Sequence, residues 1–164
     1  MNPSARPNPL QKFLHRILMT KLISSALARV LYRLDKWLLG LSGGRHTLTE
    51  MVGLPVVELT TTGARTGRIH TMPLVALFDG EKIALIGSNF GRKNNPGWYY
   101  NLLANPECKI RINGRDHDYY ARQAVGEEHE KYWKMGVSYY RGYERYKTRV
   151  AHRTIPVMVL VPAK

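Results

Sequence analysis

Residues 71–87 have the sequence TMPLVALFDGEKIALIG, and they contain the clearest fold signal in the chain. Two apolar runs rich in strand-forming residues, 71–78 and 82–87, lie on either side of Asp79-Gly80. Because Asp-Gly readily adopts the backbone angles of a tight hairpin turn, this stretch predicts two antiparallel strands. Pro73 fits the first strand only if its missing N–H falls at a sheet edge or at a bulge.

The remaining sequence after residue 50 adds strands and helices to this hairpin. Four further strands are expected, over residues 56–61, 109–112, 116–125 and 155–161. The second and third of these flank Asn113-Gly114, which predicts another hairpin turn. Helices are expected over residues 96–103 and from residue 126 to about residue 146. About six strands with antiparallel pairing and peripheral helices predict an α+β fold whose sheet closes into a small β-barrel.

The first 50 residues differ in character from the rest and predict a basic amphipathic helical extension. Apolar residues recur at helical spacing between Leu10 and Leu39, but Lys21 and Arg29 interrupt the run. The uninterrupted segments are too short for a transmembrane helix, and no clear cleavage site of a secretory signal follows them. Two alternatives remain open: the helix packs on the protein's own core, or it lies on an anionic membrane surface. The predicted domains are therefore this extension, residues 1–50, and a β-barrel domain, residues 51–164.

The composition narrows the classes of function. The 164 residues suffice for one domain, and their formal net charge of +13 predicts attraction to nucleic acid, anionic lipid or a multiply anionic small molecule. Cys108 is the one cysteine, which excludes an internal disulfide and argues against a cysteine-based zinc site. The histidines lack metal-ligand spacing, and the chain has no P-loop, dinucleotide-binding or serine-elbow motif. The sequence therefore predicts binding surfaces, with neither a metal site nor a covalent nucleophile.

A glycine-bearing loop with two arginines follows the first predicted strand. Residues 60–68 have the sequence TTTGARTGR. The glycines allow a ligand to approach the backbone closely, and the forked donors of Arg65 and Arg68 suit phosphate or carboxylate groups. The alternative is an ordinary hairpin loop with two solvated arginines.

A second loop and a group of tyrosines are the other candidate binding features of the sequence. Residues 87–101, GSNFGRKNNPGWYYN, lead from a strand through a basic loop into a helix start, where backbone N–H groups favour anions. Trp98 suits either stacking on a planar ring or a place in the core. Tyr140, Tyr143 and Tyr146 recur at helical spacing, which is typical of core packing or of a pocket wall for a flat, partly polar molecule.

In this order, these features carry a family resemblance that covers residues 55–162. The matching residues are the Thr-Thr-Thr-Gly-x-Arg-Thr-Gly loop with Pro73-Leu74, the Ser88 loop, Asn95-Pro96-x-Trp98-Tyr99-x-Asn101-Leu102, Ala104-Asn105-Pro106, Tyr140-x-x-Tyr143-x-x-Tyr146 and Arg153-Thr154-Ile155-Pro156-Val157. With these motifs the chain resembles the deazaflavin-dependent nitroreductase family, whose members are also described as quinone reductases that use reduced coenzyme F420.

The resemblance implies a split β-barrel enzyme that transfers a hydride from reduced coenzyme F420 to a quinone-like or nitroaromatic acceptor. The cofactor is a deazaflavin whose tail carries a phosphate and glutamates. The implied cofactor-binding residues are Arg65, Thr66, Arg68, His70, Pro73, Leu74, Gly87, Ser88, Asn89, Gly97, Trp98, Tyr99, Tyr100 and Asn101. Ser88 and Tyr143 are implied as catalytic residues, and Tyr140, Tyr143 and Tyr146 as substrate-binding residues.

Other functions stay open from the sequence. The same barrel could bind FMN or FAD, or act as a non-enzymatic carrier of a deazaflavin, haem or lipid. A nucleic-acid partner is disfavoured because the aromatic residues cluster in predicted helices rather than among basic residues on strands. We expect a cytoplasmic protein. Peripheral contact with the inner face of an anionic membrane and a homodimer are further hypotheses.

Overall fold

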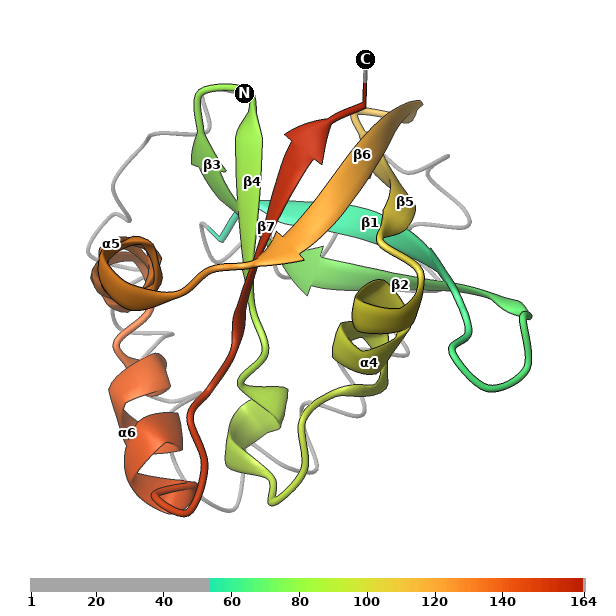
Figure 1. Ribbon diagram of the computed structural model, residues 1–164. Helices are drawn as coiled ribbons and strands as arrows, with labels where there is room; N and C mark the ends of the chain where they lie inside the picture. Colours follow the sequence, from blue (N-terminus) through green and yellow to red (C-terminus); the bar gives the residue numbers. More distant parts are fainter. Residues whose placement is uncertain (1–53, 164) are drawn as a thin grey trace.

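Seven strands form one antiparallel sheet in the computed structural model, which describes residues 54–163 (Figure 1). The strands are β1 (Val56–Thr62), β2 (Ile69–Val75), β3 (Leu77–Asp79), β4 (Lys82–Ile86), β5 (Glu107–Ile112), β6 (Arg115–Gln123) and β7 (Val157–Pro162). Their order across the sheet is β2-β1-β5-β6-β7-β4-β3. The helices are α4 (Gly97–Ala104), α5 (Gly126–Tyr139), α6 (Gly142–Arg149) and the short 3-10 helix η1 (Asn89–Gly91).

The predicted strand over residues 71–78 divides into two strands at Ala76. β2 pairs with β1 and β3 pairs with β4, so consecutive segments of the chain occupy opposite edges of the described sheet. The sheet must therefore curl until its edges approach each other, which makes a barrel with a split. Ala76 is fully buried at the bend, and its N–H donates to the Pro55 carbonyl, 2.9 Å away. Pro73 lies in β2, so the expected edge position is confirmed.

The expected α+β split barrel is confirmed, with seven described strands in place of about six because one strand bends. Both predicted hairpins are present. In the first, Asp79 pairs with Lys82 around Gly80, which has a φ of 61°. The second turns at Asn113 and Gly114, and both have the positive φ that an Asn-Gly turn requires.

Apolar side chains cover both faces of the sheet and form two cores. One core fills the barrel, where α4 contributes Trp98, and the other lies between the sheet and the aromatic side chains of α5 and α6. Figure 1 shows α5 and α6 together on one side of the barrel and α4 on the other. In β7, Met158 and Leu160 belong to the first core, and Val157 and Val159 belong to the second. Burial on both faces explains why β7 is a continuous apolar run in the sequence.

The prediction of one continuous helix from residue 126 to about residue 146 is wrong. Helix α5 ends at Tyr139 and α6 begins at Gly142, with Tyr140 in an extended conformation (φ −145°, ψ 103°). The ring of Tyr140 folds over Gly142, where a Cβ atom would lie 2.2 Å from the ring. Glycine at this position therefore permits the close reversal between the two helices, which the spacing of the tyrosines does not reveal.

The prediction of a helical extension over residues 1–50 lies outside the described residues. The predicted domain boundary likewise falls before Leu54, the first described residue. Among the helices described between residues 54 and 163, none has the length and apolar character needed to cross a membrane.

Candidate active site

The split of the barrel lies between β2 and the last part of β4. Within residues 54–163, β2 pairs with β1 alone, and the pairing of β3 with β4 ends at Leu77 and Ala84. From Leu85 onward, β4 has a described partner only on its β7 side. Strands β2 and β4 nevertheless lie in contact. Among the described residues, two strand edges with unpaired backbone donors and acceptors therefore border the split, and such groups require a partner.

The loop between β1 and β2 is tied to α4 by asparagine side chains. Asn101 uses both atoms of its amide: Oδ1 accepts from the Ala64 N–H at 3.0 Å, and Nδ2 donates to the Thr61 hydroxyl at 3.1 Å. Asn105 donates to the Thr62 carbonyl at 3.3 Å. These bonds fix the end of β1 to the helix, so the loop leaves the barrel in a defined direction.

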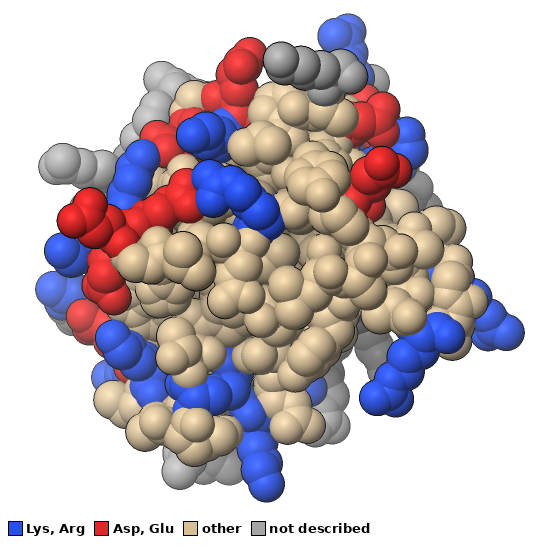
Figure 2. All heavy atoms as spheres, in the orientation of Figure 1, with Lys and Arg blue, Asp and Glu red and all other residues tan. Residues whose placement is uncertain are grey.

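Four predicted binding residues, Arg65, Thr66, Arg68 and His70, are exposed on this loop and at the start of β2. The ring of His70 lies over Gly63, where a Cβ atom would be 3.0 Å from Nε2. Figure 2 shows basic side chains at the tip of this loop and along the lower edge around η1 and α6, with a mostly uncharged surface between them. Neither arginine forms an ion pair within residues 54–163. Both are available to an anionic ligand.

A loop with left-handed backbone follows β4. Asn89, Phe90 and Gly91 have φ values of 47°, 56° and 71° in succession. This conformation costs a bulky side chain such as Phe90 about 1–2 kcal/mol. The Phe90 ring packs edge-on against Tyr146, with ring centroids 6.4 Å apart. Strain of this kind is found mostly where the surrounding structure holds a loop for a function.

Ser88 opens this loop with its hydroxyl unpartnered. Its N–H donates to the Ile86 carbonyl at 2.9 Å, but its hydroxyl has no hydrogen bond within the described part of the chain. The preceding Gly87 donates to the Pro156 carbonyl at 2.8 Å, and a Cβ on Gly87 would lie 2.8 Å from the Pro156 ring. Only glycine lets β4 end this close to the chain that enters β7. Ser88 thereby follows directly after β4, a strand that borders the split, and its hydroxyl is free to hydrogen-bond a ligand within the described part of the chain.

Helix α4 does not direct its first residues toward one side. Trp98 is 5% exposed and belongs to the core inside the barrel. The Tyr99 hydroxyl donates to Gln123 Oε1 at 2.9 Å, on β6. Tyr100 is 48% exposed, and Gly97 has open space where a Cβ would lie. The structure therefore does not bring residues 97–101 together as a single wall, although it places their helix beside the β1–β2 loop.

Pro73 and Leu74, predicted to line the same ligand, belong to opposite faces of β2. Leu74 pairs with Val57 and packs on the core inside the barrel. Pro73 pairs with Glu58, whose side chain is on the other face of β1. The edge of β2, rather than one of its faces, is therefore what these two residues share.

The three tyrosines predicted for the substrate side form one aromatic cluster. The ring centroids of Tyr140, Tyr143 and Tyr146 lie 5.7 to 6.2 Å apart. Tyr143 and Tyr146 are each 6% exposed, and burial raises the pKa of both hydroxyls well above the usual value of 10.0. Both phenols therefore keep their protons at neutral pH. The Tyr143 hydroxyl has no hydrogen bond within residues 54–163, whereas the Tyr140 and Tyr146 hydroxyls lie 3.4 Å apart.

Comparisons with known proteins found a matching family and similar solved structures. The family model of F420H(2)-dependent quinone reductases matches residues 31–162. An F420H(2)-dependent quinone reductase of Mycobacterium tuberculosis (strain ATCC 25618 / H37Rv) is 32% identical over 109 residues, which are 65% of this chain and 72% of the relative. A solved structure described as an F420-H2 dependent reductase is 36% identical, covers 65% of this chain and 93% of its own, and has a TM-score of 0.60. A second solved structure, described as a domain-swapped dimer, is 31% identical, with coverage of 85% and 96% and a TM-score of 0.62.

The chain belongs to the F420H(2)-dependent quinone reductase family. Membership confirms the predicted family, the oxidoreductase class and coenzyme F420 as the cofactor. The chemistry of the split fits this cofactor. An anionic tail requires cationic donors, which Arg65 and Arg68 supply from an exposed loop, and the polar edge of a flat ring requires hydrogen-bonding groups. The Ser88 hydroxyl and the two strand edges offer such groups.

Sequence reasoning missed one residue of this quinone reductase that the structure places at the loop after β4. Arg153 directs its guanidinium into residues 88–95 and donates to several of their carbonyl groups. The sequence around it gives little indication of a role, because it shows only a single arginine in the connection that leads into an apolar strand. Arg153 is part of one motif of the family resemblance, but the position of this motif in the sequence does not predict a role for the arginine.

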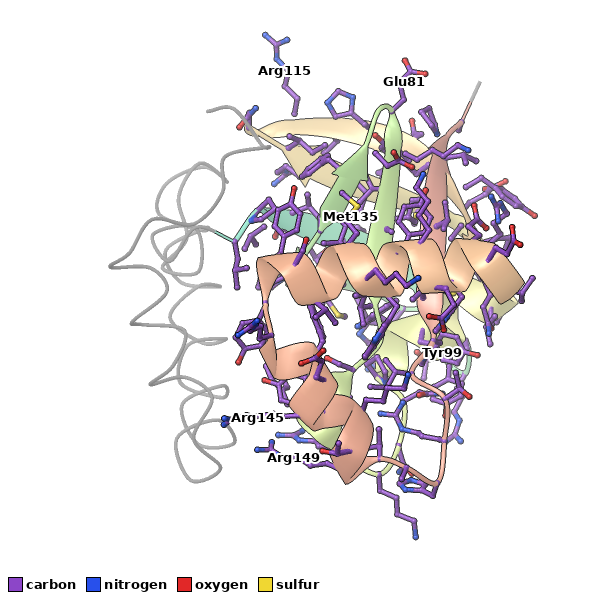
Figure 3. The ribbon with its side chains drawn as sticks, turned by 90° about the vertical axis from the view of Figure 1, so that its left-hand side faces the viewer. Glu81, Tyr99, Arg115, Met135, Arg145 and Arg149 are labelled. Carbon is purple, nitrogen blue, oxygen red and sulfur yellow. The ribbon has the colours of Figure 1, made fainter. Side chains whose placement is uncertain are left out.

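One cavity of this family member lies apart from the predicted site. It measures about 950 Å³ and is bordered by the start of α5, the end of β6 and residues 154–156. Of the predicted site residues only Tyr99 lines it, and Figure 3 shows Tyr99 below α5. Across residues 54–163, no group of three His, Cys, Asp or Glu side chains could hold a metal ion.

Proposed function

We propose that this protein transfers a hydride from reduced coenzyme F420 to a quinone-type acceptor at the split of the barrel. One observation carries this proposal: within residues 54–163 the two strand edges at the split lack a pairing strand, and β4 leads directly into Ser88, whose hydroxyl is unpartnered there. The family of the chain supports the same reaction. Coenzyme F420 supplies the hydride when bound, and the protein supplies position and electrostatics.

In this proposal the two ends of the cofactor bind to different parts of the barrel. Arg65, Thr66, Arg68 and His70 bind the phosphate and the glutamates. The ring lies along the edges that carry Pro73, Leu74, Gly87, Ser88 and Asn89. On α4, Gly97 and Tyr100 are available for contact, whereas Trp98, Tyr99 and Asn101 support the site from behind, because their side chains are already engaged. The Ser88 hydroxyl donates a hydrogen bond to a polar atom of the ring.

Tyr143 orients the acceptor in this proposal, with Tyr140 and Tyr146 packed around it. Its hydroxyl is unpartnered within the described residues, and its raised pKa disfavours loss of the proton. A neutral phenol that holds its proton donates a hydrogen bond to a quinone carbonyl and need not transfer the proton. A nitroaromatic compound presents oxygens that can accept the same bond, so it is the second acceptor class.

The test is to titrate the full chain anaerobically with reduced coenzyme F420 and, separately, with reduced FMN. A soluble naphthoquinone or a nitroaromatic compound is then added as the acceptor. We expect binding of reduced F420 and its oxidation by the quinone, followed by the return of the absorbance of the oxidised deazaflavin. Turnover with FMN in place of F420 would contradict the proposal. Binding of F420 without oxidation by any acceptor would instead identify a carrier.

Contact with an anionic membrane is a further part of the proposal. Figure 2 shows basic side chains at the tip of the β1–β2 loop and along the edge around η1 and α6. These groups and the basic sequence of residues 1–50 support this contact, because anionic lipid attracts such groups and quinones with isoprenoid tails reside in lipid. The full chain should sediment with vesicles that contain phosphatidylglycerol and not with pure phosphatidylcholine vesicles. Equal sedimentation with both would contradict it.

A homodimer is the last part of the proposal. It is supported by the relative described as a domain-swapped dimer, which matches 85% of this chain at 31% identity. Light scattering of the full chain should give twice the 18.8 kDa mass of one chain. A single-chain mass at assay concentration would contradict the dimer without affecting the proposed reaction.

A further inference from the structure

Arg153 lies in the connection between α6 and β7, and its guanidinium is surrounded by acceptors from the loop after β4. The acceptors are the carbonyl oxygens of Lys93 (3.1 Å from Nε), of Ser88, Arg92 and Asn94 (3.2, 3.1 and 3.5 Å from Nη2) and Asn95 Oδ1, which accepts from Nη1. His152 adds a contact between Nε2 and the Lys93 carbonyl, 3.0 Å apart. Residues 88–95 are therefore gathered around one cation.

The charge of Arg153 is balanced by carbonyl groups. No carboxylate pairs with it among the ion pairs of residues 54–163. Burial lowers the pKa of its guanidinium from the usual value, yet an arginine stays charged at neutral pH. Several carbonyl dipoles that point at one place repel one another unless a cation lies between them. Only the planar fork of arginine offers donors in the several directions that these acceptors occupy.

The loop that Arg153 holds is the one with the left-handed backbone at Asn89 and Phe90. A loop in this conformation persists only where outside contacts determine it. The segment around Arg153 supplies such contacts at both ends of the Ser88 region, because Pro156 accepts from Gly87 and Arg153 donates to the Ser88 carbonyl. Removal of the guanidinium would leave the strained turn without its central partner.

We propose that Arg153 is a positioning residue for the reaction: its guanidinium fixes the loop of residues 88–95 so that the Ser88 hydroxyl stays at the split. The effect of Arg153 on turnover rests on the proposed function, whereas its effect on the loop of residues 88–95 does not. Arg153 itself touches neither cofactor nor acceptor in this account. A small displacement of a group that orients reactants lowers the rate by about 100-fold, which sets the expected size of the effect.

The experiment compares Arg153→Lys and Arg153→Ala with wild type and with Arg115→Ala. Arg115 is a matched control because its side chain projects from the β5–β6 hairpin, at the opposite end of the barrel from α6 (Figure 3). Hydrogen–deuterium exchange reports the loop directly through the N–H groups of Gly91 and Arg92, which donate to the Ser88 and Asn89 carbonyls. Turnover and the dissociation constant for coenzyme F420 are measured separately, at a temperature well below each variant's melting point.

We expect faster exchange over residues 88–95 in Arg153→Lys, with unchanged exchange in the β1–β2 loop. In the same variant, kcat should fall about 100-fold while the dissociation constant for coenzyme F420 stays within threefold. Millimolar guanidinium should restore kcat in Arg153→Ala and leave Arg115→Ala as it was. Unchanged exchange in a folded Arg153→Lys overturns the inference, as does an unchanged kcat. If wild type oxidises no F420H2, the proposed function fails, and the exchange data alone still decide whether Arg153 holds the loop.

Discussion

The side-chain amide of Asn101 accepts a hydrogen bond from the backbone N–H of Ala64, 3.0 Å away and 37 residues earlier in the chain. The same amide donates to the Thr61 hydroxyl at 3.1 Å. One side chain therefore holds both the end of strand β1 and the loop that follows it. Arg65 is the next residue after this anchor. The direction in which the arginine loop leaves the barrel therefore depends on a side chain of α4.

Asn101→Ala should weaken the binding of coenzyme F420 through its tail. The variant loses two hydrogen bonds, each with a net value of about 1 kcal/mol, so the dissociation constant should rise by up to about 30-fold. Fluorescence titration measures it. The control ligand is a deazaflavin riboside without phosphate or glutamates, whose affinity should not change. Equal weakening for both ligands would show that Asn101 acts on the ring site instead.

The arginines of the β1–β2 loop should make cofactor binding depend on salt. Both Arg65 and Arg68 are exposed, so each contributes about 0.2–1 kcal/mol to the binding of an anionic tail, and salt screens this contribution. The double variant Arg65→Ala/Arg68→Ala should bind coenzyme F420 about tenfold more weakly at low ionic strength. The affinity of this double variant for coenzyme F420 should then vary little between about 20 mM and about 500 mM salt, because the charges that salt would screen are absent. Arg115→Ala, at the far end of the barrel, should keep the wild-type salt dependence.

Tyr143→Phe should lower kcat about tenfold, the loss expected for one hydrogen bond to the reacting acceptor. A larger loss, of 100-fold or more, is typical of a residue that transfers a proton. Because burial raises the pKa of Tyr143, wild-type kcat should show no decrease from ionisation of this phenol between pH 6 and about pH 9. Tyr120→Phe, which changes an exposed tyrosine on β6, is the matched control. Unchanged turnover of every quinone by Tyr143→Phe would remove Tyr143 from the site.

The hairpins and the barrel were predictable because their signals are local. Asp79-Gly80 and Asn113-Gly114 adopt turn conformations whatever surrounds them, and alternating or continuous apolar runs mark the strands. The division of residues 71–78 at Ala76 was not predictable, since the apolar pattern continues through the bend. The bend exists only because the closed barrel requires this segment to pair with β1 first and then with β4.

The candidate site was predictable in part for the same reason. The glycines and arginines in the sequence correctly indicated the loop between β1 and β2 and the loop after β4, because residues of these types commonly lie in loops at strand ends. The roles of Trp98 and Asn101 depend on which face of α4 packs on the barrel, and consecutive polar and aromatic residues do not reveal that face. Arg153 reaches acceptors that are 58 to 65 residues away in the chain, so no local pattern could identify it.

Cys108 should be unreactive in the folded protein. Its side chain is buried, and burial, with a smaller contribution from the charge of Asp118, raises the pKa of the thiol to about 12. At pH 8 only about one thiol in ten thousand is therefore ionised, and the thiolate is the reactive form. A disulfide reagent should label no cysteine in the native state and one per chain after unfolding in guanidinium. Rapid native labelling would show that β5 opens readily.

Asp79 should make the stability of the hairpin and α5 depend on pH. Hydrogen bonds from Lys131 (2.6 Å) and from the buried Tyr132 hydroxyl (2.9 Å) lower the pKa of this carboxyl below its usual 3.8. A lowered pKa in the folded state means that the stabilisation is complete above the unfolded value and is lost as the pH falls through the folded value. Asp79→Asn should therefore lower the free energy of unfolding by about 1–2 kcal/mol at pH 7, mainly through the buried phenol.

Urea unfolding between pH 7 and pH 3 measures this difference between wild type and Asp79→Asn, which should shrink below about pH 4 as the wild-type carboxyl takes up a proton. Asp118→Asn is the matched control, because Asp118 pairs with Lys109 on the surface, where both side chains are more than half exposed. An exposed pair of this kind contributes about 0.5 kcal/mol or less. A difference for Asp79→Asn that stays constant down to pH 3 would mean that the charge of Asp79 contributes nothing, and that the effect comes from packing at the β3–β4 turn.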